Sequence, residues 1–364
     1  MFFSMIEFFH SCFENRRLLG VRSFAASFAA LQRRKPGPCI RALASEPIIS
    51  NIAAIVKEKP ELAILIPCYN EEITIGKVID DFRTQLPEAE IYVFDNCCTD
   101  RTAEIAGAHG AHVIHEPRKG KGFVIESMLD TVKADFYVLV DGDDTYPAES
   151  VHALLVPVRS GKADMAVGAR LSLYSNESFR SLHIFGNRLV CNLINKIFHA
   201  HLSDIMSGYR AFNRRVIQRI PIVSSGFEVE TELTVQMLYY KLKIVEIDVP
   251  YRGRPGGSIS KLRSLPDGMR VLWKIFSLFR SFKPLTFFGT FGIFVFLLSV
   301  LSAIQPVYSY IQSGYREIPH STLLASLAAS FLLLSFGLVF LGLLLHAINW
   351  RFKELHNIII RRHD

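Results

Sequence analysis

Two aspartates separated by one glycine carry the strongest chemical signal in this 364-residue sequence. Asp141, Gly142 and Asp143 come at the end of an apolar run, residues 136–140, that has the composition of a buried strand. Carboxylates at alternate positions past a strand end can converge on one hard cation, and Mg²⁺ and Mn²⁺ prefer such oxygen ligands, often completed by substrate phosphates. Asp141 and Asp143 are therefore candidate metal ligands. An acidic turn without a metal is the alternative.

Polar residues also follow other apolar runs. Residues 67–72 come after the run at 62–66, and residues 95–100 come after the run at 90–94. An acid and an amide at a strand end suit hydrogen bonds to a nucleobase and ribose, and we assign ligand contact to Asp95. Residues 118–122 form a basic, glycine-containing turn that opens a helical segment and suits a phosphate or a nucleotide edge. A solvated surface turn is the alternative for this last segment.

The spacing of apolar residues predicts an α/β fold. Strands are predicted at 62–66, 90–94, 111–115, 136–140, 165–168 and 244–250, and helices at 73–86, 102–109, 121–133, 149–160, 179–199 and 231–240, with a polar turn at 204–210. Alternation of this kind is typical of a mainly parallel sheet with helices on both faces. Ligands on such sheets bind at the carboxyl ends of the strands, where the polar segments fall.

Two apolar runs near the C-terminus, residues 285–308 and 323–348, are each long enough to cross a hydrocarbon core ~30 Å thick. Basic residues flank the pair, whereas the loop between them holds only Arg316, beside Glu317. The positive-inside rule then places the catalytic domain and the C-terminus in the cytoplasm, in an integral membrane protein with two spans. Residues 265–282 read as an amphipathic helix with a basic face, suited to the membrane interface.

The formal net charge is +7, and the basic residues gather beside the apolar runs. This distribution favours membrane lipid and phosphate partners, and we expect no nucleic-acid partner. The six cysteines show no metal-ligand spacing and would stay reduced in a cytoplasmic domain. Residues 1–60 are of uncertain role, because their Arg- and Ser-rich composition fits a transit peptide, a membrane-surface helix or a plain extension.

The ordered motifs resemble those of glycosyltransferase family 2, and within it the polyprenyl-phosphate glycosyltransferases, such as dolichyl-phosphate mannose synthases and undecaprenyl-phosphate glucosyltransferases. The motifs are Ile66-Pro67-Cys68-Tyr69-Asn70-Glu71-Glu72, Asp95-Asn96-Cys97-Cys98-Thr99-Asp100, Gly120-Lys121-Gly122, Asp141-Gly142-Asp143, Gly168-Ala169-Arg170 and Ser207-Gly208-Tyr209-Arg210-Ala211-Phe212. The resemblance implies a GT-A catalytic domain at 61–262, an amphipathic juxtamembrane helix at 263–283, two transmembrane helices at 284–350 and a basic cytoplasmic tail at 351–364.

The resemblance also implies an activity: inverting, metal-dependent transfer of a sugar from a UDP- or GDP-linked donor to a membrane polyprenyl phosphate, with Mg²⁺ or Mn²⁺ as cofactor. It assigns donor contacts to Pro67, Tyr69, Glu71, Asp95, Lys121, Asp141 and Gly142, and catalysis to Asp143, Arg170, Asp204, Arg210 and Glu230. Arg170 and Arg210 would contact phosphate. A homo-oligomer is compatible with the sequence.

The acceptor phosphate is assigned to the basic loop at 251–263, through Arg252, Arg254, Ser258 and Lys261. Arginine matches phosphate oxygens well, although attraction to anionic headgroups would use the same residues. The alternative activity is transfer to a lipid or glycan hydroxyl, with Glu230 as the base. Glu230 could equally orient the sugar, or belong to an acid-rich helix start.

Several positions depart from the family pattern. Asp95-Asn96-Cys97-Cys98 stands where the family often has Asp-Asp-Gly-Ser, so base or ribose preference can differ. Thr145 stands where the subgroup often has a glutamine that serves as a further metal ligand, and Asp144 is a candidate to compensate. The Gln-x-x-Arg-Trp motif of processive polysaccharide synthases is missing, which argues against a chitin- or cellulose-type polymerase.

Overall fold

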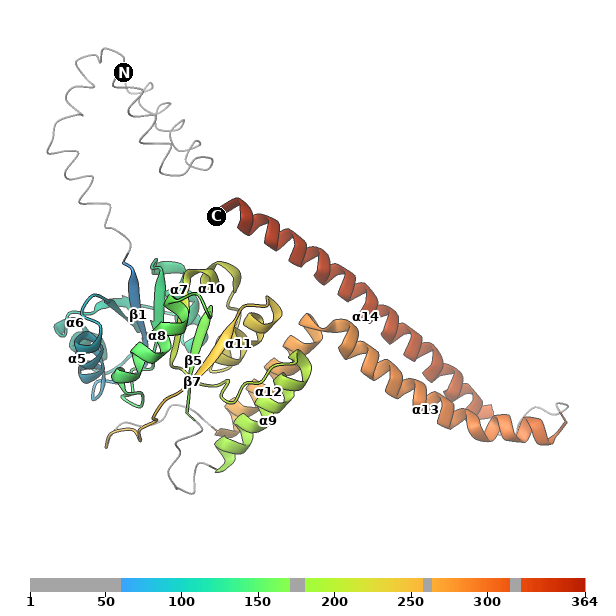
Figure 1. The fold of residues 1–364 in the computed structure, drawn as a ribbon. Helices are drawn as coiled ribbons and strands as arrows, with labels where there is room; N and C mark the ends of the chain where they lie inside the picture. Colours follow the sequence, from blue (N-terminus) through green and yellow to red (C-terminus); the bar gives the residue numbers. More distant parts are fainter. Residues whose placement is uncertain (1–59, 171–180, 258–263, 315–321, 364) are drawn as a thin grey trace, which may run out of the picture. The chain divides into compact units, whose positions relative to one another are not determined.

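A computed structural model describes residues 60–170, 181–257, 264–314 and 322–363 (Figure 1). The predictions for residues 1–59 and for Ser258 and Lys261 therefore fall outside the described residues. The centre of the fold is a seven-stranded sheet in the order β3-β2-β1-β4-β6-β5-β7. Its strands are β1 (Leu62–Cys68), β2 (Glu90–Asp95), β3 (His112–His115), β4 (Phe136–Leu139), β5 (Met165–Ala169), β6 (Arg210–Asn213) and β7 (Ile244–Asp248).

The sheet is mainly parallel, as predicted. Strand β1 is parallel to both β2 and β4, β2 is parallel to β3, and β5 is parallel to β7. Strand β6 runs antiparallel to both β4 and β5. It was not predicted, because its apolar pair, Ala211 and Phe212, is too short to show a period of two, and only its first residue, Arg210, falls in the predicted polar turn.

Helices cover both faces of the sheet. Alternate residues of β1 point to opposite sides, so Leu62, Ile64 and Ile66 face one core, and Ala63 and Leu65 face the other. The first core is closed by α5 (Ile75–Gln85), α6 (Thr102–Ala108) and α8 (Val151–Arg159), which follows the short 3-10 turn η1 (Ala148–Ser150). The second is closed by α7 (Lys121–Thr131), α10 (Arg214–Arg219) and α11 (Val229–Tyr239). Helix α10 was not predicted.

A third apolar cluster joins α11 to α9 (Ser181–Phe198) and α12 (Ser264–Phe282). Val190 and Ile194 of α9 meet Val235 of α11, and Val271 and Ile275 of α12 complete the cluster. Apolar residues at helical spacing on α12 therefore face the protein. Three other apolar side chains of α12, those of Met269, Trp273 and Phe276, are exposed.

Two long helices end the chain: α13 (Pro284–Gln312) and α14 (Thr322–His363). Residues 284–312 and 322–359 are long and apolar enough to cross a membrane, and few of their side chains are buried. The two helices pack closely, because the Ser299 and Ser335 hydroxyls donate to carbonyls of the facing helix and a Cβ on Gly292 would come within 2.9 Å of Val339. The predicted basic tail is a continuation of α14.

Candidate active site

The Asp141–Asp143 turn follows β4 at the edge where the parallel strands β1, β2 and β4 end. Backbone crowding explains its glycine, since a Cβ on Gly142 would lie 2.7 Å from the Cys68 sulfur. Gly208 approaches the turn from the other side, and a Cβ there would overlap the Asp141 carboxylate. The predicted motifs around Cys68, Gly142 and Gly208 therefore meet at one place.

Asp143 lies at the centre of this edge and is only 5% exposed. Its Oδ1 accepts a 2.6 Å hydrogen bond from the Thr145 hydroxyl, and its Oδ2 lies 2.5 Å from Nη2 of Arg254. Burial and the neighbouring Asp141 charge raise the pKa of Asp143, although Arg254 opposes them. Asp144 points elsewhere, because its carboxylate accepts a 2.9 Å bond from Lys77 on α5. Of the two candidates to complete the metal shell, only Thr145 contacts Asp143 in this structure.

Lys121 joins two further predicted residues. Its ammonium lies 2.6 Å from Asp141 Oδ1 and 2.6 Å from Glu230 Oε1. Burial would lower the pKa of Lys121, but the charges of Asp141 and Glu230 outweigh burial and raise it. A largely buried cation thus links the start of α7, the metal turn and the start of α11.

The glycines beside Lys121 have a packing role. A Cβ on Gly120 or Gly122 would collide with the backbone of Ser224 and Ser225. The backbone N–H of Gly120 donates to Asn96 Oδ1 at 2.8 Å, and that of Gly122 donates to the Ser225 carbonyl at 3.1 Å. These two N–H groups are therefore used within the protein, which differs from the predicted backbone cradle for a phosphate.

The loops after β1 and β2 are tied to each other. Asp95 accepts a 2.8 Å bond from the Cys98 N–H, and its other oxygen lies 2.9 Å from His115 Nδ1. Although burial raises the pKa of Asp95, the bonds from Cys98 and His115 outweigh it, so the pKa is lowered. The amide of Asn70 bonds Thr99 from the opposite loop. Asp95 is thus an ionised, oriented acceptor, and His115 is a neighbour that the sequence did not single out.

Three other predicted donor residues lie on this side. Pro67 is the penultimate residue of β1 and pairs with Phe94 of β2. The Tyr69 hydroxyl accepts a 2.7 Å bond from Lys119, whose ammonium also lies 4.5 Å from the ring centre. The Glu71 carboxylate lies 3.3 Å from Nη1 of Arg254.

Arg170 and Asp204 form a bidentate ion pair, with N–O distances of 2.8 and 3.0 Å. Burial would raise the pKa of Asp204, but the Arg170 charge and its hydrogen bonds outweigh burial and lower it. The Arg170 guanidinium also lies 5.4 Å from the centre of the Tyr251 ring. That ring contacts Tyr146, whose hydroxyl is within 3.3 Å of Ser207 Oγ. Tyr146 was not singled out from the sequence, because an aromatic residue after an acidic turn is typical of a core position.

Arg210 differs from its predicted role. Its side chain is 0% exposed, and its guanidinium donates to the carbonyls of Ser207, Ile205 and Glu230. Burial lowers the pKa of Arg210. In this geometry it holds the backbone around the site, and its charge also interacts with the carboxylates of Glu230 and Asp204. The structure thus gives Arg210 a positioning role, and the phosphate contact stays a prediction.

The loop after β7 lies on the metal turn. The N–H of Arg252 donates to the Thr145 carbonyl at 2.9 Å, while its guanidinium lies 3.8 Å from the Glu149 carboxylate. Arg254 contacts Asp143 and Glu71, as described above. Of the residues assigned to the acceptor phosphate, Arg254 is therefore in contact with the metal turn through its side chain.

The donor set is compatible with Mg²⁺ or Mn²⁺. Among the described residues, no group of three or more His, Cys, Asp or Glu side chains surrounds a common point. Asp141 and Asp143 nevertheless offer two neighbouring carboxylates, and burial together with the Asp141 charge raises the pKa of Asp143. Mg²⁺ is commonly held by one or two carboxylates, with substrate phosphates and water as the other ligands.

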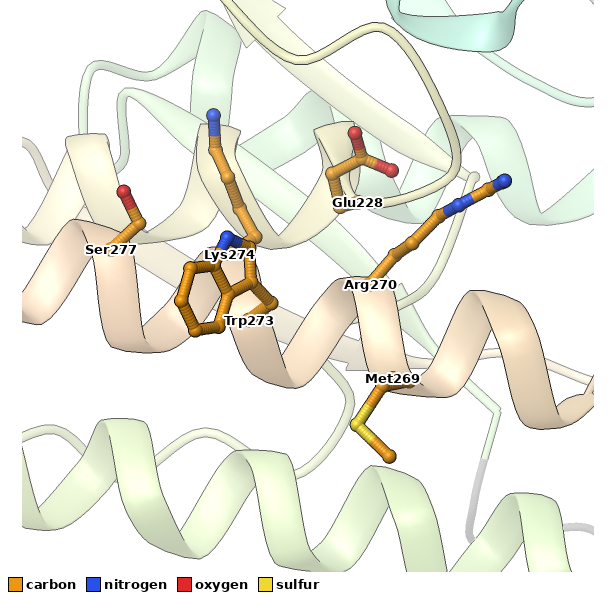
Figure 2. Close-up of a pocket in the computed structure, with 6 residues that line it drawn as sticks. All are labelled: Glu228, Met269, Arg270, Trp273, Lys274 and Ser277. Carbon is orange, nitrogen blue, oxygen red and sulfur yellow. The ribbon is translucent and has the colours of Figure 1, made fainter.

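A second feature lies on α12, beside the start of α11. A groove of about 610 Å³ is lined by Glu228, Met269, Arg270, Trp273, Lys274 and Ser277 (Figure 2). Lys274 lies 3.2 Å from the buried Glu232 carboxylate, whereas Trp273 is 70% exposed. Figure 2 shows Met269 pointing away from the charged ends of Arg270 and Lys274. The helix thus separates a basic side from an apolar side.

Comparisons with known proteins agree with the fold and the motifs. Residues 63–220 match the family described as Glycosyl transferase family 2. The chain is 31% identical over 283 residues to glycosyltransferase AglJ of Haloferax volcanii, covering 76% of this chain and 92% of that protein. It is 32% identical over 198 residues to a dolichyl-phosphate hexose transferase of the same organism, covering 54% of this chain and 85% of that protein.

Solved structures show the same fold. Glucosyl-3-phosphoglycerate synthase from Mycobacterium tuberculosis, in complex with Mn²⁺, UDP-glucose and phosphoglyceric acid, has a TM-score of 0.51 at 21% identity. The match covers 68% of this chain and 86% of that one. The mainly parallel sheet, the family match and the similarity to AglJ agree. The chain therefore belongs to glycosyltransferase family 2 and is a nucleotide-sugar-dependent glycosyltransferase with a GT-A fold.

Proposed function

We propose that this protein transfers a sugar from a nucleotide-sugar to a membrane polyprenyl phosphate, with a divalent metal and with inversion at the anomeric carbon. The observation that carries the proposal is the contact between Arg254 and Asp143. It places a cation from the loop assigned to the acceptor directly beside a carboxylate assigned to the donor's metal. Donor and acceptor phosphates would then meet at one point of the sheet edge.

On the donor side, Asp141 and Asp143 would hold Mg²⁺ or Mn²⁺ together with the diphosphate of a UDP- or GDP-linked sugar. When bound, the cation would act as a Lewis acid that stabilises the departing nucleoside diphosphate. Asp95 would accept hydrogen bonds from the nucleoside, and its bonds with Cys98 and His115 would hold its carboxylate in position for this. Arg170, held by Asp204, would add positive charge near the leaving group.

On the acceptor side, a polyprenyl phosphate suits this site because it is already anionic near neutral pH. It needs no base, so the protein's work is to position it in line with the anomeric carbon. Single displacement inverts that centre, and an α-linked donor gives a β-linked product. The similarity to a dolichyl-phosphate hexose transferase supports a lipid phosphate of this class.

Transfer to a hydroxyl would need a base, and Glu230 is the predicted one. Its carboxylate is paired with Lys121 at 2.6 Å, and its own carbonyl accepts a bond from Arg210. The ion pair with Lys121 occupies the carboxylate that would have to accept the proton of an acceptor hydroxyl. The contacts of Glu230 therefore favour the phosphate acceptor.

The membrane would bring the acceptor to the site. Helices α13 and α14 would cross the bilayer, with the catalytic domain and the C-terminus on the cytoplasmic side by the positive-inside rule. Helix α12 would lie in the interface, with Trp273 and Met269 towards the lipid and Arg270 near anionic headgroups.

Membranes that contain the protein should convert polyprenyl phosphate and a labelled nucleotide-sugar into a labelled lipid when Mn²⁺ or Mg²⁺ is present. Glu230→Gln separates the two acceptor classes, because a general base would be lost for a hydroxyl acceptor only. Absence of lipid product with every common UDP- and GDP-sugar, alongside transfer to a hydroxyl acceptor, would overturn the proposal.

A further inference from the structure

The two carboxylates of the metal turn are each neutralised by a side chain of the protein itself. Lys121 lies 2.6 Å from Asp141, and Arg254 lies 2.5 Å from Asp143. These two cations differ in how they are held. Lys121 belongs to the first turn of α7, is largely buried and also contacts Glu230. Arg254 belongs to an irregular loop, and a quarter of its side chain is exposed.

The backbone of that loop is fixed independently of Arg254. The Val249 N–H donates to the Ala169 carbonyl, and the Arg252 N–H donates to the Thr145 carbonyl, both at 2.9 Å. The Tyr251 ring contacts Tyr146. The Arg254 side chain can therefore change partners while the loop stays attached to the metal turn. Arg254 is also two residues past the last of these backbone anchors, next to Pro255.

A divalent cation on Asp143 and the guanidinium of Arg254 compete for one largely buried carboxylate. Two positive groups at one such carboxylate repel strongly, because the effective dielectric constant is low. The guanidinium also matches a phosphate as well as it matches a carboxylate, since both accept its paired N–H donors. Displacement from Asp143 would therefore leave Arg254 beside the reaction centre with a strong preference for an anionic oxygen group.

We propose that Arg254 is an exchangeable counter-ion that couples the two substrates: it holds Asp143 until metal and nucleotide bind, and it then binds the acceptor phosphate. The consequence is an order of binding, with donor before acceptor. Glu71 supports the first position, because its carboxylate also contacts Arg254 and adds to the negative charge that keeps it there. This inference rests on the proposed function, because it takes the metal and the phosphate acceptor from it.

The first step, competition between Arg254 and the metal for Asp143, can be tested by titrating the purified full-length protein with Mn²⁺ in the absence of nucleotide. Electron paramagnetic resonance measures the binding. Arg254→Gln should bind Mn²⁺ about tenfold more tightly than the wild type, since one competing charge is gone. Arg254→Lys keeps the charge and should stay close to the wild type. Arg159→Gln is the matched control for net charge, because its partners Glu61 and Glu88 precede β1 and β2 at the opposite edge of the sheet. Unchanged or weaker Mn²⁺ binding by Arg254→Gln would overturn the competition.

The wild-type protein provides a second test that needs no variant. Phenylglyoxal modifies accessible arginines, and mass spectrometry can follow Arg254 alone. Its reaction should be slow in the free protein, faster with Mn²⁺ and UDP or GDP, and slow again when a short-chain polyprenyl phosphate is added. If Mn²⁺ and nucleotide without acceptor slow the modification of Arg254, the guanidinium does not become accessible when the donor binds. That result would overturn the exchange.

The two proposals fail in different ways. If Mn²⁺ does not bind even with nucleotide present, the metal-dependent function itself is wrong. If Mn²⁺ binds with nucleotide but neither its affinity nor the labelling of Arg254 responds as expected, the function stands and the exchange is wrong.

Discussion

We call the segments that follow β1, β2 and β4 the donor edge. The side chains of the donor edge and those on the outer side of α12 have different kinds of partners. At the donor edge, polar groups bond one another within a loop, as Asp95 does with Cys98, and between segments, as Asn96 does with Gly120 and Asn70 with Thr99. On α12, by contrast, Met269 and Trp273 remain mostly exposed. The chain thus sets the geometry of the donor edge by itself, whereas α12 presents a surface suited to a lipid environment.

This difference gives the two regions different sensitivities. A substitution at the donor edge should alter a network of charges that is built into the fold, so it should act on chemistry or on stability. A substitution on the outer side of α12 should act only through the surroundings that cover it. A large catalytic effect of a substitution on α12, or a negligible effect of a substitution at the metal turn, would contradict this difference.

The largest effect is expected for Asp143→Ala. It removes one of two proposed metal ligands, and transfer should fall by at least about 10²–10³-fold, the range for loss of one preorganised electrostatic group at a reaction centre. Calorimetry should show that Mn²⁺-dependent binding of a nucleoside diphosphate is lost as well. Asp144→Asn is the control, because that carboxylate bonds Lys77 and points away from the turn. Equal losses for both variants would mean that Asp144 belongs to the metal site.

Lys121→Met should produce the next largest effect, on stability. The substitution leaves Asp141 and Glu230 without their shared cation, and breaking a buried pair in this way costs about 3–5 kcal/mol. Thermal unfolding in detergent measures the change. Lys133→Met is the matched control, since Lys133 is exposed after α7 and should change stability little. A loss below about 1 kcal/mol would show that the ion pair is not part of the folded framework.

The donor edge is also the region that could be predicted best from the sequence. Short apolar runs followed by polar residues revealed β1, β2 and β4, and the rule that ligands bind past strand ends brought Asp95 and Asp141 together. The ion pair of Arg170 with Asp204 and that of Lys121 with Glu230 could not be predicted, because each joins segments at least 34 residues apart. No local pattern encodes such a distance.

Strand β6 and Arg210 were harder for a physical reason. The strand is only four residues long and lies between two others, so its pairing depends on the finished sheet. Arg210 begins that strand, and arginine is rarely found fully buried. Its position inside the protein depends on the Ile205 carbonyl in the preceding turn and the Glu230 carbonyl in α11, and sequence reasoning therefore placed it near a phosphate.

A smaller effect is expected for Trp273→Ala on α12. If this side chain enters the membrane interface, its loss should raise the KM for polyprenyl phosphate in liposomes by about tenfold or less, with the KM for the nucleotide-sugar unchanged. Val156→Ala on α8 is the matched control, because Val156 is 66% exposed and Trp273 is 70% exposed. A fall in kcat for Trp273→Ala would place this residue in the reaction itself and would remove the distinction between the two regions.

The smallest effect is expected for Asp204→Asn, and it should depend on pH. The lowered pKa of Asp204 means that its ion pair with Arg170 stabilises the folded state above the unfolded pKa of about 3.9. That stabilisation is lost as the pH falls through the folded pKa, because the carboxylate is then protonated in both states. The wild type should therefore be more stable than Asp204→Asn at pH 7, and thermal unfolding in detergent should show the difference shrinking below about pH 4.

Glu88→Gln, at an exposed pair, should show no such trend. A constant difference between wild type and Asp204→Asn would mean that Asp204 acts through its shape and hydrogen bonds, which asparagine retains in part, and that its charge is not what organises this side of the donor edge.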